Sequence, residues 1–252
     1  MTSRYGLIGF PLGHSFSKAF FTEKFQRENI DAKYDLFPIP DLNGLIDLVK
    51  GLPGLKGLNV TIPYKQKIIA LLNDVSPQAS EIDAVNTIKI SRKNDSLYLR
   101  GYNTDAPAFK SELTDFCKLK YGKALVLGSG GACSAVIHIL NSLDWDYKVV
   151  SRNIVGTNNI RYQDIDEKII QETNLIVNTT PLGMFPDIQA APPLPYNYLN
   201  SKHYLFDLIY NPQITEFMKQ GILKGSKVRN GMGMLFKQAE LSWNIWQDID
   251  LK

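Results

Sequence analysis

One lysine, one aspartate and one glycine-rich segment carry most of the chemistry that this sequence suggests. Lys65 follows an apolar, β-branched stretch, Asp105 precedes an expected helix, and the glycine-rich segment occupies residues 128–132. A lysine ammonium can stabilise and protonate the oxyanion that forms when a ketone accepts a hydride, and an aspartate can share that proton. A glycine-rich turn at the start of a helix suits the pyrophosphate of a dinucleotide. Together these residues predict hydride transfer to or from a secondary alcohol.

Both ionisable residues also have plainer interpretations. Without its surrounding motif, Lys65 is an ordinary solvated lysine in the first turn of a helix. Asp105 is the cap of the helix that begins with Ala106 and Pro107, because proline favours the first helical turn. A cap leaves one carboxylate oxygen for chemistry, so the two roles of Asp105 are compatible. The sequence leaves open which of the pair accepts the proton in the reverse reaction, since coupled groups share their protons.

The glycine-rich segment lies between an apolar strand, residues 124–127, and an amphipathic helix, residues 132–143. It consists of Gly128, Ser129, Gly130, Gly131 and Ala132. Glycines let the backbone approach a pyrophosphate, and the N–H groups at the helix start attract it. Cys133 takes the place of the pattern's third glycine, so the match is partial and a plain strand-to-helix turn is the alternative. The strand–turn–helix context favours dinucleotide binding.

The segment after the next expected strand, residues 148–150, suggests which dinucleotide is bound. It consists of Ser151, Arg152 and Asn153, with no acidic residue among them. Sites for NAD usually place Asp or Glu here to hold the ribose 2′-hydroxyl. A guanidinium instead grips a 2′-phosphate through charge-assisted hydrogen bonds. The sequence therefore predicts NADP, with a solvated surface arginine as the alternative.

Composition places the chain among ordinary soluble globular proteins. It has 252 residues, 44% of them hydrophobic and 21% charged, which suits one large domain or two smaller ones. Neither an apolar run of about eighteen residues nor a signal-peptide pattern is present, so we expect no membrane partner. A formal charge of +3 without a basic block predicts no nucleic-acid partner. The two cysteines form no disulfide framework, which favours a cytoplasmic location.

The three histidines suggest no further chemistry. His14, His138 and His203 are widely dispersed, and we predict no metal site. Adjacent residues of an extended segment point to opposite faces, so His14 and Ser15 are not expected to form the nucleophilic pair of a hydrolase.

Hydrophobic periodicity predicts two α/β units joined near residue 104. The first has expected strands at 5–8, 34–37 and 58–62, helices at 18–29, 42–49 and 64–72, and a hairpin of 84–91 with 97–101. Ser17 is the expected cap of the first helix, and Asp41 opens the second. The second unit has the strands and helix given above, further strands at 175–177 and 204–206, and a loop at 186–195.

The last expected helix, residues 234–246, is predicted to return to the first unit. Phe236, Ala239, Trp243 and Trp246 form its apolar stripe, and Gln238 falls off that stripe. The predicted division is therefore 1–103 with 234–252 for the first domain and 104–233 for the second.

Five short motifs, in this order, resemble those of the shikimate dehydrogenase family. They lie at residues 9–17, 59–65, 103–105, 128–132 and 230–234, and the resemblance spans roughly residues 5–247. It implies an α/β protein with an N-terminal substrate domain, a Rossmann-like NADP domain and a C-terminal helix that returns to the first domain. The implied reaction is the reversible reduction of 3-dehydroshikimate to shikimate in aromatic amino acid biosynthesis. The implied partner is this small molecule, and the assembly that we expect is a monomer or homodimer.

The resemblance also implies roles for individual residues. Lys65 and Asp105 handle the proton. The substrate contacts are Ser15, Ser17, Thr61, Asn86, Tyr210 and Gln238. Ser15 and Ser17 alternate on an expected extended segment, so both hydroxyls are predicted to share one face. The segment 178–181, which includes Thr179, resembles the loop that lines the cofactor side, and Leu208 and Gly231 align with positions near the nicotinamide.

Departures from the family pattern are few, and two rival functions remain. Lys18 stands where proline is common, Ala108 where glycine is common, and Ser151 and Asn153 flank the arginine where asparagine and threonine are common. The last departure alters two possible phosphate contacts.

The two rival functions are a quinate/shikimate dehydrogenase with relaxed cofactor use and a non-catalytic NADP-binding sensor on the same scaffold. Retention of the predicted catalytic and substrate residues together argues against the sensor.

Overall fold

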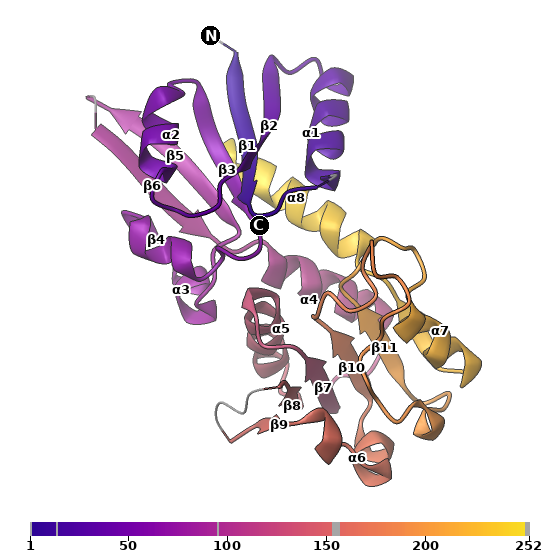
Figure 1. Ribbon diagram of the computed structural model, residues 1–252. Coiled ribbons are helices and arrows are strands. Elements are labelled where there is room, and N and C mark those ends of the chain that lie inside the picture. Colours follow the sequence, from indigo (N-terminus) through magenta and orange to yellow (C-terminus); the bar gives the residue numbers. More distant parts are fainter. Residues whose placement is uncertain (1, 14, 95, 153–156, 250–252) are drawn as a thin grey trace. The chain divides into compact units, whose positions relative to one another are not determined.

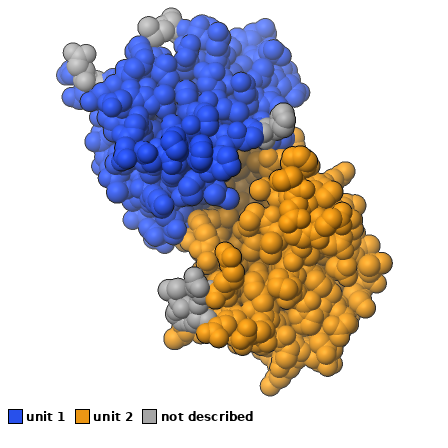
Figure 2. Space-filling view, in the orientation of Figure 1, with its two compact units in different colours: residues 1–104, 239–252 blue, residues 105–238 orange. Residues whose placement is uncertain are grey.

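A computed structural model describes residues 2–13, 15–94, 96–152 and 157–249. The chain forms two compact units, coloured separately in Figure 2. The first consists of Met1–Thr104 with Ala239–Lys252, and the second of Asp105–Gln238. Each unit has its own six-stranded sheet. In the described part of the chain, no helix is long and apolar enough to cross a membrane.

The sheet of the first unit is mixed. Its strands are β1 (Ser3–Gly9), β2 (Ala32–Pro38), β3 (Leu55–Val60), β4 (Asp74–Val75), β5 (Thr87–Lys93) and β6 (Ser96–Tyr102), in the order β2-β1-β3-β5-β6-β4. β1 pairs in parallel with both β2 and β3, whereas β5 runs antiparallel to β3 and forms the predicted hairpin with β6. This mixture brings the ends of β1, β3 and β6 and the start of β5 to one edge of the sheet.

Helices cover both faces of this sheet (Figure 1). α1 (Phe16–Arg27) and the C-terminal part of α8 (Met232–Trp246) contribute to one hydrophobic cluster, and α2 (Leu45–Gly51), the 3₁₀ helix η1 (Lys67–Leu71) and α3 (Pro77–Ile82) contribute to the other. Side chains alternate along a strand. On β3, Leu58 and Val60 accordingly join the α2 cluster, whereas Asn59 contacts α8 and a Cβ on Gly57 would collide with the Trp246 indole.

The first helix starts earlier than the sequence predicts. α1 begins at Phe16, and its N-cap is Ser15, with extended angles φ −101° and ψ 119° and no side-chain capping bond. The rings of Phe16 and Phe20 stack one turn apart, which stabilises this extra turn. Ser17 is therefore helical, so its expected role as the cap is wrong, and so is the argument that placed it with Ser15 on one extended segment.

The segment expected to be a helix over 64–72 is instead a turn followed by η1. The Lys65 carbonyl accepts a hydrogen bond from the Val85 N–H at 2.7 Å, and the Ile69 N–H donates to the Gln66 carbonyl at 3.2 Å. This second bond has the i→i−3 spacing of a 3₁₀ helix. Because a tertiary bond engages its carbonyl, Lys65 lies in the turn before η1 and not in the first turn of an α-helix.

The structure differs from the sequence prediction at two further places. α2 begins at Leu45, three residues later than expected, because the Asp41 carboxylate accepts a bond from the Asn43 N–H at 2.8 Å and stabilises a turn there. β4 and α3 were not predicted. α3 has a regular start, with Ser76 as N-cap accepting a bond from the Ala79 N–H and Pro77 at the first helical position.

The sheet of the second unit is wholly parallel. Its strands are β7 (Lys123–Leu127), β8 (Asp146–Val150), β9 (Asn159–Ile160), β10 (Leu175–Asn178), β11 (Tyr204–Asp207) and β12 (Lys227–Arg229), in the order β12-β11-β10-β7-β8-β9. Counted within this unit from β9, the order is 3-2-1-4-5-6, which is that of dinucleotide-binding sheets. Such sheets bind their ligand where the order reverses, here between β7 and β10.

Helices also flank the second sheet (Figure 1). α4 (Asp105–Phe116) packs against β11 through Phe109 and Phe206, whose ring centroids are 5.3 Å apart, and it neighbours α5 (Gly131–Ser142). A separate hydrophobic cluster includes residues of α6 (Glu167–Glu172) and α7 (Glu216–Leu223). The remaining short elements are the 3₁₀ helices η2 (Tyr162–Asp164) and η3 (Tyr196–Tyr198).

The starts of α4 and α8 each differ slightly from the prediction. α4 begins at Asp105 itself, one residue early, so this aspartate lies in the first helical turn and not before it. α8 begins at Met232 and spans the boundary between the two units. Phe236 is 45% exposed, so its expected place in the buried stripe is wrong, whereas Ala239, Trp243 and Trp246 are buried as predicted.

Candidate active site

The glycine-rich turn joins β7 to α5 at the switch point of the second sheet. Gly128 has φ +113°, a conformation that L side chains rarely adopt, and an added Cβ would lie 2.6 Å from Thr179 Oγ1. The Gly128 N–H donates to the Val150 carbonyl at 2.8 Å. The turn is therefore fixed between the ends of β8 and β10, which is possible only with glycine at this position.

The start of α5 is open to a ligand. Gly130 is its N-cap and has no side chain that can accept from the first N–H groups of the helix. A Cβ built on Gly130 meets nothing within 4 Å, and Ser129 is exposed. Backbone N–H groups of Gly131 and Ala132 lie in this first turn, where the helix dipole favours an anion. Open space, backbone donors and partial positive charge together fit a pyrophosphate.

Thr179 lies on the β10 side of the switch point, directly after that strand. Its N–H and its Oγ1 both donate to the Leu127 carbonyl, at 2.9 and 2.6 Å. These two bonds hold the loop after β10 against the end of β7, next to Gly128. The structure therefore brings Thr179 to the glycine-rich turn, although the two segments are about fifty residues apart in the sequence.

The segment after β8 places a cation at the carboxyl edge of the sheet. Arg152 is exposed and directly follows the buried Ser151, whose N–H donates to the Ile160 carbonyl at 3.1 Å. Burial raises the pKa of Tyr162 to about 12, and the positive charge of Arg152 opposes this rise. Asn153, the third predicted phosphate contact, lies outside the described residues.

Two loops meet beside the ends of β10 and β11. The Leu208 N–H donates to the Asn178 carbonyl at 3.0 Å, and the Gly231 N–H donates to the Ile209 carbonyl at 3.0 Å. A Cβ on Gly231 would collide with the Leu208 carbonyl, so only glycine permits this approach. Tyr210 follows in the same loop, which brings three predicted residues to the carboxyl edge of the second sheet.

Asp207, which the sequence analysis missed, organises this edge. It is fully buried at the end of β11. Its carboxylate accepts from Thr215 Oγ1 at 2.6 Å, from the Ile209 N–H at 3.0 Å and from Asn178 Nδ2 at 3.0 Å. Burial raises its pKa from 3.8 to about 6, and these three donors oppose the rise. An aspartate at the end of an apolar strand, directly before Leu208, was the available sequence signal.

This raised pKa predicts a pH dependence of stability. From about pH 4 to about pH 6, the folded protein retains the Asp207 proton that the unfolded chain has released. As pH rises through this range, the free energy of unfolding therefore falls, because the folded state binds more protons than the unfolded chain at Asp207. We expect Asp207→Asn to abolish that part of the slope in urea-unfolding measurements, whereas Asp187→Asn, at an exposed position, keeps it. An unchanged slope in Asp207→Asn would contradict the assignment.

In the first unit, predicted substrate residues gather at one sheet edge. Thr61 directly follows β3, and its N–H donates to the Ile8 carbonyl near the end of β1 at 3.0 Å. Asn86 directly precedes β5, and its N–H donates to the Tyr102 carbonyl at the end of β6 at 3.0 Å. Lys65 is tied to the same edge through Val85, the neighbour of Asn86. The mixed pairing of the sheet thus brings Thr61, Lys65 and Asn86 together.

The two serines approach this edge from α1. Ser15 precedes the helix, and the Ser17 side chain hydrogen-bonds Tyr34 of β2. The other predicted residues, Asp105, Tyr210 and Gln238, belong to the second unit. Gln238 Nε2 donates to the Leu235 carbonyl at 2.9 Å, which orients its side chain along α8. The predicted set therefore divides into two groups, one in each unit.

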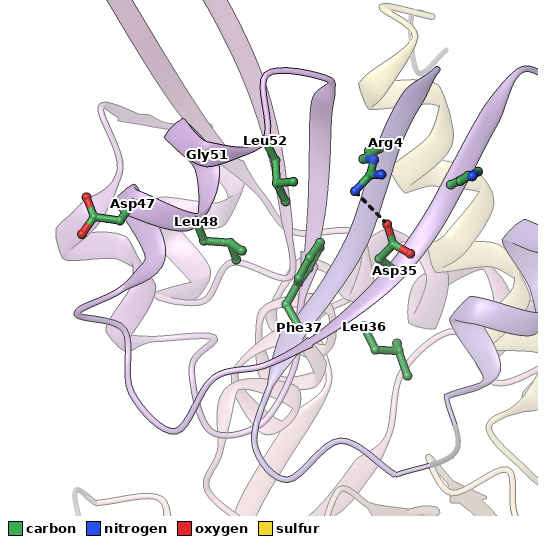
Figure 3. A pocket seen from close by; sticks show the side chains of 9 residues that line it. Arg4, Asp35, Leu36, Phe37, Asp47, Leu48, Gly51 and Leu52 are labelled. Atoms are coloured by element: carbon green, nitrogen blue, oxygen red, sulfur yellow. Dashed lines mark ion pairs between the residues drawn. The ribbon is translucent and has the colours of Figure 1, made fainter. Parts of the chain in front are cut away.

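A shallow groove on the first unit lies apart from these residues (Figure 3). Its lining includes Arg4, Phe37, Asp47 and Leu52, and the Arg4 guanidinium lies 3.9 Å from the Asp35 carboxylate. None of the predicted substrate or cofactor residues lines it. Ligands of parallel sheets bind beyond the carboxyl ends of the strands, whereas Arg4 lies near the start of β1. We assign the groove no role in the reaction.

These features define a class of protein. A doubly wound parallel sheet with a glycine-rich turn at its switch point is typical of enzymes that use a nicotinamide dinucleotide. The first unit adds serine, threonine, lysine and asparagine side chains, which suit a polar small molecule. In the described part of the chain, no cluster of His, Cys, Asp and Glu can hold a metal ion. The chain is a dinucleotide-dependent oxidoreductase.

Comparisons with known proteins identify the family. The description "Shikimate dehydrogenase substrate binding domain" matches residues 7–88. A shikimate dehydrogenase (NADP(+)) from Clostridium beijerinckii is 39% identical over 258 residues, which cover 98% of this chain and 93% of that protein. The chain belongs to the shikimate dehydrogenase family.

Solved structures agree with this assignment. A chorismate mutase/shikimate 5-dehydrogenase fusion protein from Clostridium acetobutylicum has a TM-score of 0.87 and 37% identity, covering 100% of this chain and 93% of that one. The shikimate 5-dehydrogenase from Thermus thermophilus, in complex with NADP(H) and shikimate, has a TM-score of 0.84 and 31% identity, covering 98% of this chain and 94% of that one. The predicted family and α/β fold class, with a substrate domain and a Rossmann-like NADP domain, are confirmed.

Proposed function

We propose that this chain catalyses the reversible, NADP-dependent reduction of 3-dehydroshikimate to shikimate. The observation that carries the proposal is the switch-point turn of the second unit, in a chain that matches NADP-dependent shikimate dehydrogenases over nearly its full length. The cytoplasm is the proposed location, and the buried free thiols of Cys117 and Cys133 are compatible with its reducing conditions. The assembly that we propose is a monomer or homodimer.

We propose that the cofactor binds to the second unit, at the switch point of its sheet. NADPH supplies the hydride that reduces the ketone of the substrate. We propose that the backbone at Gly130 and Gly131 binds its pyrophosphate and that Arg152 binds its 2′-phosphate. Ser151 and Asn153 flank this arginine, and Thr179, Leu208 and Gly231 line the nicotinamide side. Those of these residues that the structure describes lie after β7, β8, β10, β11 and β12, at the carboxyl edge of one sheet, and this position supports the assignment.

The proton is handled by Lys65 and Asp105 in this proposal. The Lys65 ammonium stabilises the developing alkoxide and donates a proton to its oxygen, and the reverse reaction needs a base for the hydroxyl. Asp105 shares the proton. The backbone bond from Val85 to the Lys65 carbonyl limits how far the lysine can shift, since it fixes the turn before η1.

Polar side chains at two ends of the substrate would fix its orientation. Ser15 and Ser17, with Tyr210, bind the carboxylate. Thr61, Asn86 and Gln238 engage the ring hydroxyls. Such binding at both ends sets the tilt of the ring relative to the hydride donor, and a misplacement of about 1 Å can cost roughly 10²-fold in rate.

This arrangement predicts a preference for shikimate over quinate. Quinate has a tetrahedral carbon with an additional hydroxyl where shikimate has a planar ring carbon bearing the carboxylate. The segment around Ser15 and Ser17 offers no additional polar side chain in the described residues 10–13 and 15–17 to bind that hydroxyl. We expect kcat/KM for shikimate to exceed that for quinate by at least roughly tenfold, a difference of about 1.4 kcal/mol.

Initial rates with each acid at saturating NADP, repeated with NAD, test this preference. Comparable specificity constants for the two acids would favour a dual-substrate enzyme. Absence of turnover with both acids and both cofactors would favour a protein that only senses NADP.

A further inference from the structure

A continuous set of polar side chains, buried except for the half-buried Ser17, runs through the first unit behind the predicted substrate residues. We call it the polar network. Its members are Ser17, Tyr34, Asn59, Asn86, Thr87, Thr104 and Ser242. Five of these seven residues have no assigned part in binding or catalysis, whereas Ser17 and Asn86 are predicted substrate contacts. The network therefore connects two predicted contacts from behind.

Asn59 on β3 is the centre of the polar network. Its Oδ1 accepts from the Tyr34 hydroxyl at 2.8 Å. Its Nδ2 donates to Ser242 Oγ at 2.9 Å and to Thr87 Oγ1 at 3.2 Å. Asn59 is only 5% exposed, so water cannot replace these partners. Because both ends of the amide are engaged, only one orientation of the Asn59 side chain satisfies all of its bonds.

Ser242 brings α8 into the polar network. It is fully buried, and its Oγ lies 2.7 Å from Thr87 Oγ1 and 3.3 Å from Thr104 Oγ1. Trp246, one turn further along α8, donates from Nε1 to the Ile88 carbonyl at 3.0 Å. Hydrogen bonds, as well as apolar packing, thus join the returning helix to β5 and to Thr104, which follows β6.

Thr104 links these hydrogen bonds to two residues of the predicted site, Asn86 and Asp105. The Asn86 Oδ1 accepts from the Thr104 N–H at 2.7 Å, and Asn86 Nδ2 donates to Thr104 Oγ1 at 2.9 Å. This pair of bonds fixes the orientation of the Asn86 amide, because its oxygen faces the Thr104 N–H and its nitrogen faces the Thr104 hydroxyl. Thr104 also directly precedes Asp105 in the chain. The same residue therefore orients one predicted substrate contact and anchors the backbone at the start of the predicted proton-handling residue.

At the other end, the polar network reaches the serine segment. The Tyr34 hydroxyl donates to Asn59, and its oxygen accepts a hydrogen bond from the Ser17 side chain. Burial raises the Tyr34 pKa far above its ordinary value, so the phenol stays protonated and keeps its donor role. The orientation of Ser17 thus depends on the same central amide as that of Asn86.

Buried networks of this kind restrict geometry more than they add stability, because an apolar side chain can fill such a position without bonds to satisfy. We propose that Asn59 and Ser242 are positioning residues for the reaction. Through Thr87, Thr104 and Tyr34 they hold Asn86, Ser17 and the backbone before Asp105 in the geometry that shikimate requires. This inference rests on the proposed function.

Removal of one hydroxyl tests the proposal. Ser242→Ala deletes the hydroxyl contacts of α8 with little change in volume. The matched control is Ser226→Ala, which removes a buried hydroxyl that donates to the Asn200 carbonyl at 2.9 Å in the second unit. We expect Ser242→Ala to lower kcat with shikimate by about tenfold or more. The dissociation constant for NADP, which binds through the other unit, should stay within about twofold of wild type.

Three measurements separate positioning from general destabilisation. Urea-unfolding midpoints show whether the two serine variants lose similar stability, and Ser242→Thr, which restores a hydroxyl, should recover most of kcat. If Ser242→Ala does not fold, Thr87→Val removes the neighbouring hydroxyl of the same cluster with nearly the same shape and is expected to lower kcat similarly.

The outcomes are distinguishable. Equal kcat values in Ser242→Ala and Ser226→Ala, with the wild type active, would overturn the positioning role and leave the proposed function intact. If Ser242→Ala does not fold, an unchanged kcat in Thr87→Val has the same meaning. A wild type without shikimate turnover would overturn both.

Discussion

Lys65→Ala lowers kcat for shikimate oxidation by about 10² to 10⁴, the range expected when a positioned acid–base group is lost. KM for shikimate moves little, because the contact removed is strongest when charge develops on the substrate oxygen. Asp105→Asn lowers kcat as well, since the amide cannot share the proton. Steady-state rates at saturating NADP measure both effects.

A neighbouring lysine supplies the control for this experiment. Lys67, the first residue of η1, is exposed and carries the same charge, so Lys67→Ala should retain wild-type kcat. Near wild-type turnover in Lys65→Ala would show that Lys65 takes no part in the chemistry.

Arg152→Ala weakens NADP binding by roughly 10- to 100-fold and leaves NAD binding almost unchanged. A hydrogen bond to a charged group contributes about 1.5–3 kcal/mol, and each 1.4 kcal/mol is about tenfold in affinity. Only NADP carries the 2′-phosphate, so the loss is specific to it. Salt screens charge interactions at the surface, and the difference between wild type and variant should therefore narrow at high ionic strength. Calorimetric titration with each cofactor gives the four dissociation constants.

The matched control is Lys148→Ala, which removes an exposed cation from β8 before its carboxyl end. This variant should bind NADP as the wild type does. Equal affinities of the wild type for NADP and NAD would show that Arg152 does not bind the 2′-phosphate.

The parts of the fold that depend on local patterns could be predicted from the sequence. Continuous apolar runs predicted the buried parallel strands of the second unit, and the glycine-rich segment followed β7 and opened α5 as expected. The hairpin of β5 and β6 was also predicted, because the turn-forming sequence of residues 93–95 separates two strand-like segments. These signals lie within a few residues of the elements that they specify.

The parts that differ depend on contacts between distant segments. The turn at Lys65 results from a bond to Val85, about twenty residues away, so the local helical pattern of 64–72 was misleading. Phe236 fits the apolar period of α8 but is 45% exposed, whereas Ser242, a polar residue, is fully buried. Periodicity describes an average preference for burial and cannot identify a buried serine whose partners lie on other elements.

The candidate site shows the same limit. The motifs identified Thr61, Lys65 and Asn86, and the mixed sheet pairing explains why these residues gather at one edge. Asp207, Asn59 and Ser242 were not identified, because their importance arises from buried hydrogen bonds that only the folded chain reveals. Their partners come from segments that are far apart in the sequence.

Oxidation of NADPH in the presence of 3-dehydroshikimate tests the central claim most directly. The loss of NADPH absorbance should require both the purified protein and the substrate, yield shikimate in equal amount, and be much slower in Lys65→Ala. NADPH oxidation that fails to occur with the wild type, or that proceeds equally fast in Lys65→Ala, would contradict the account.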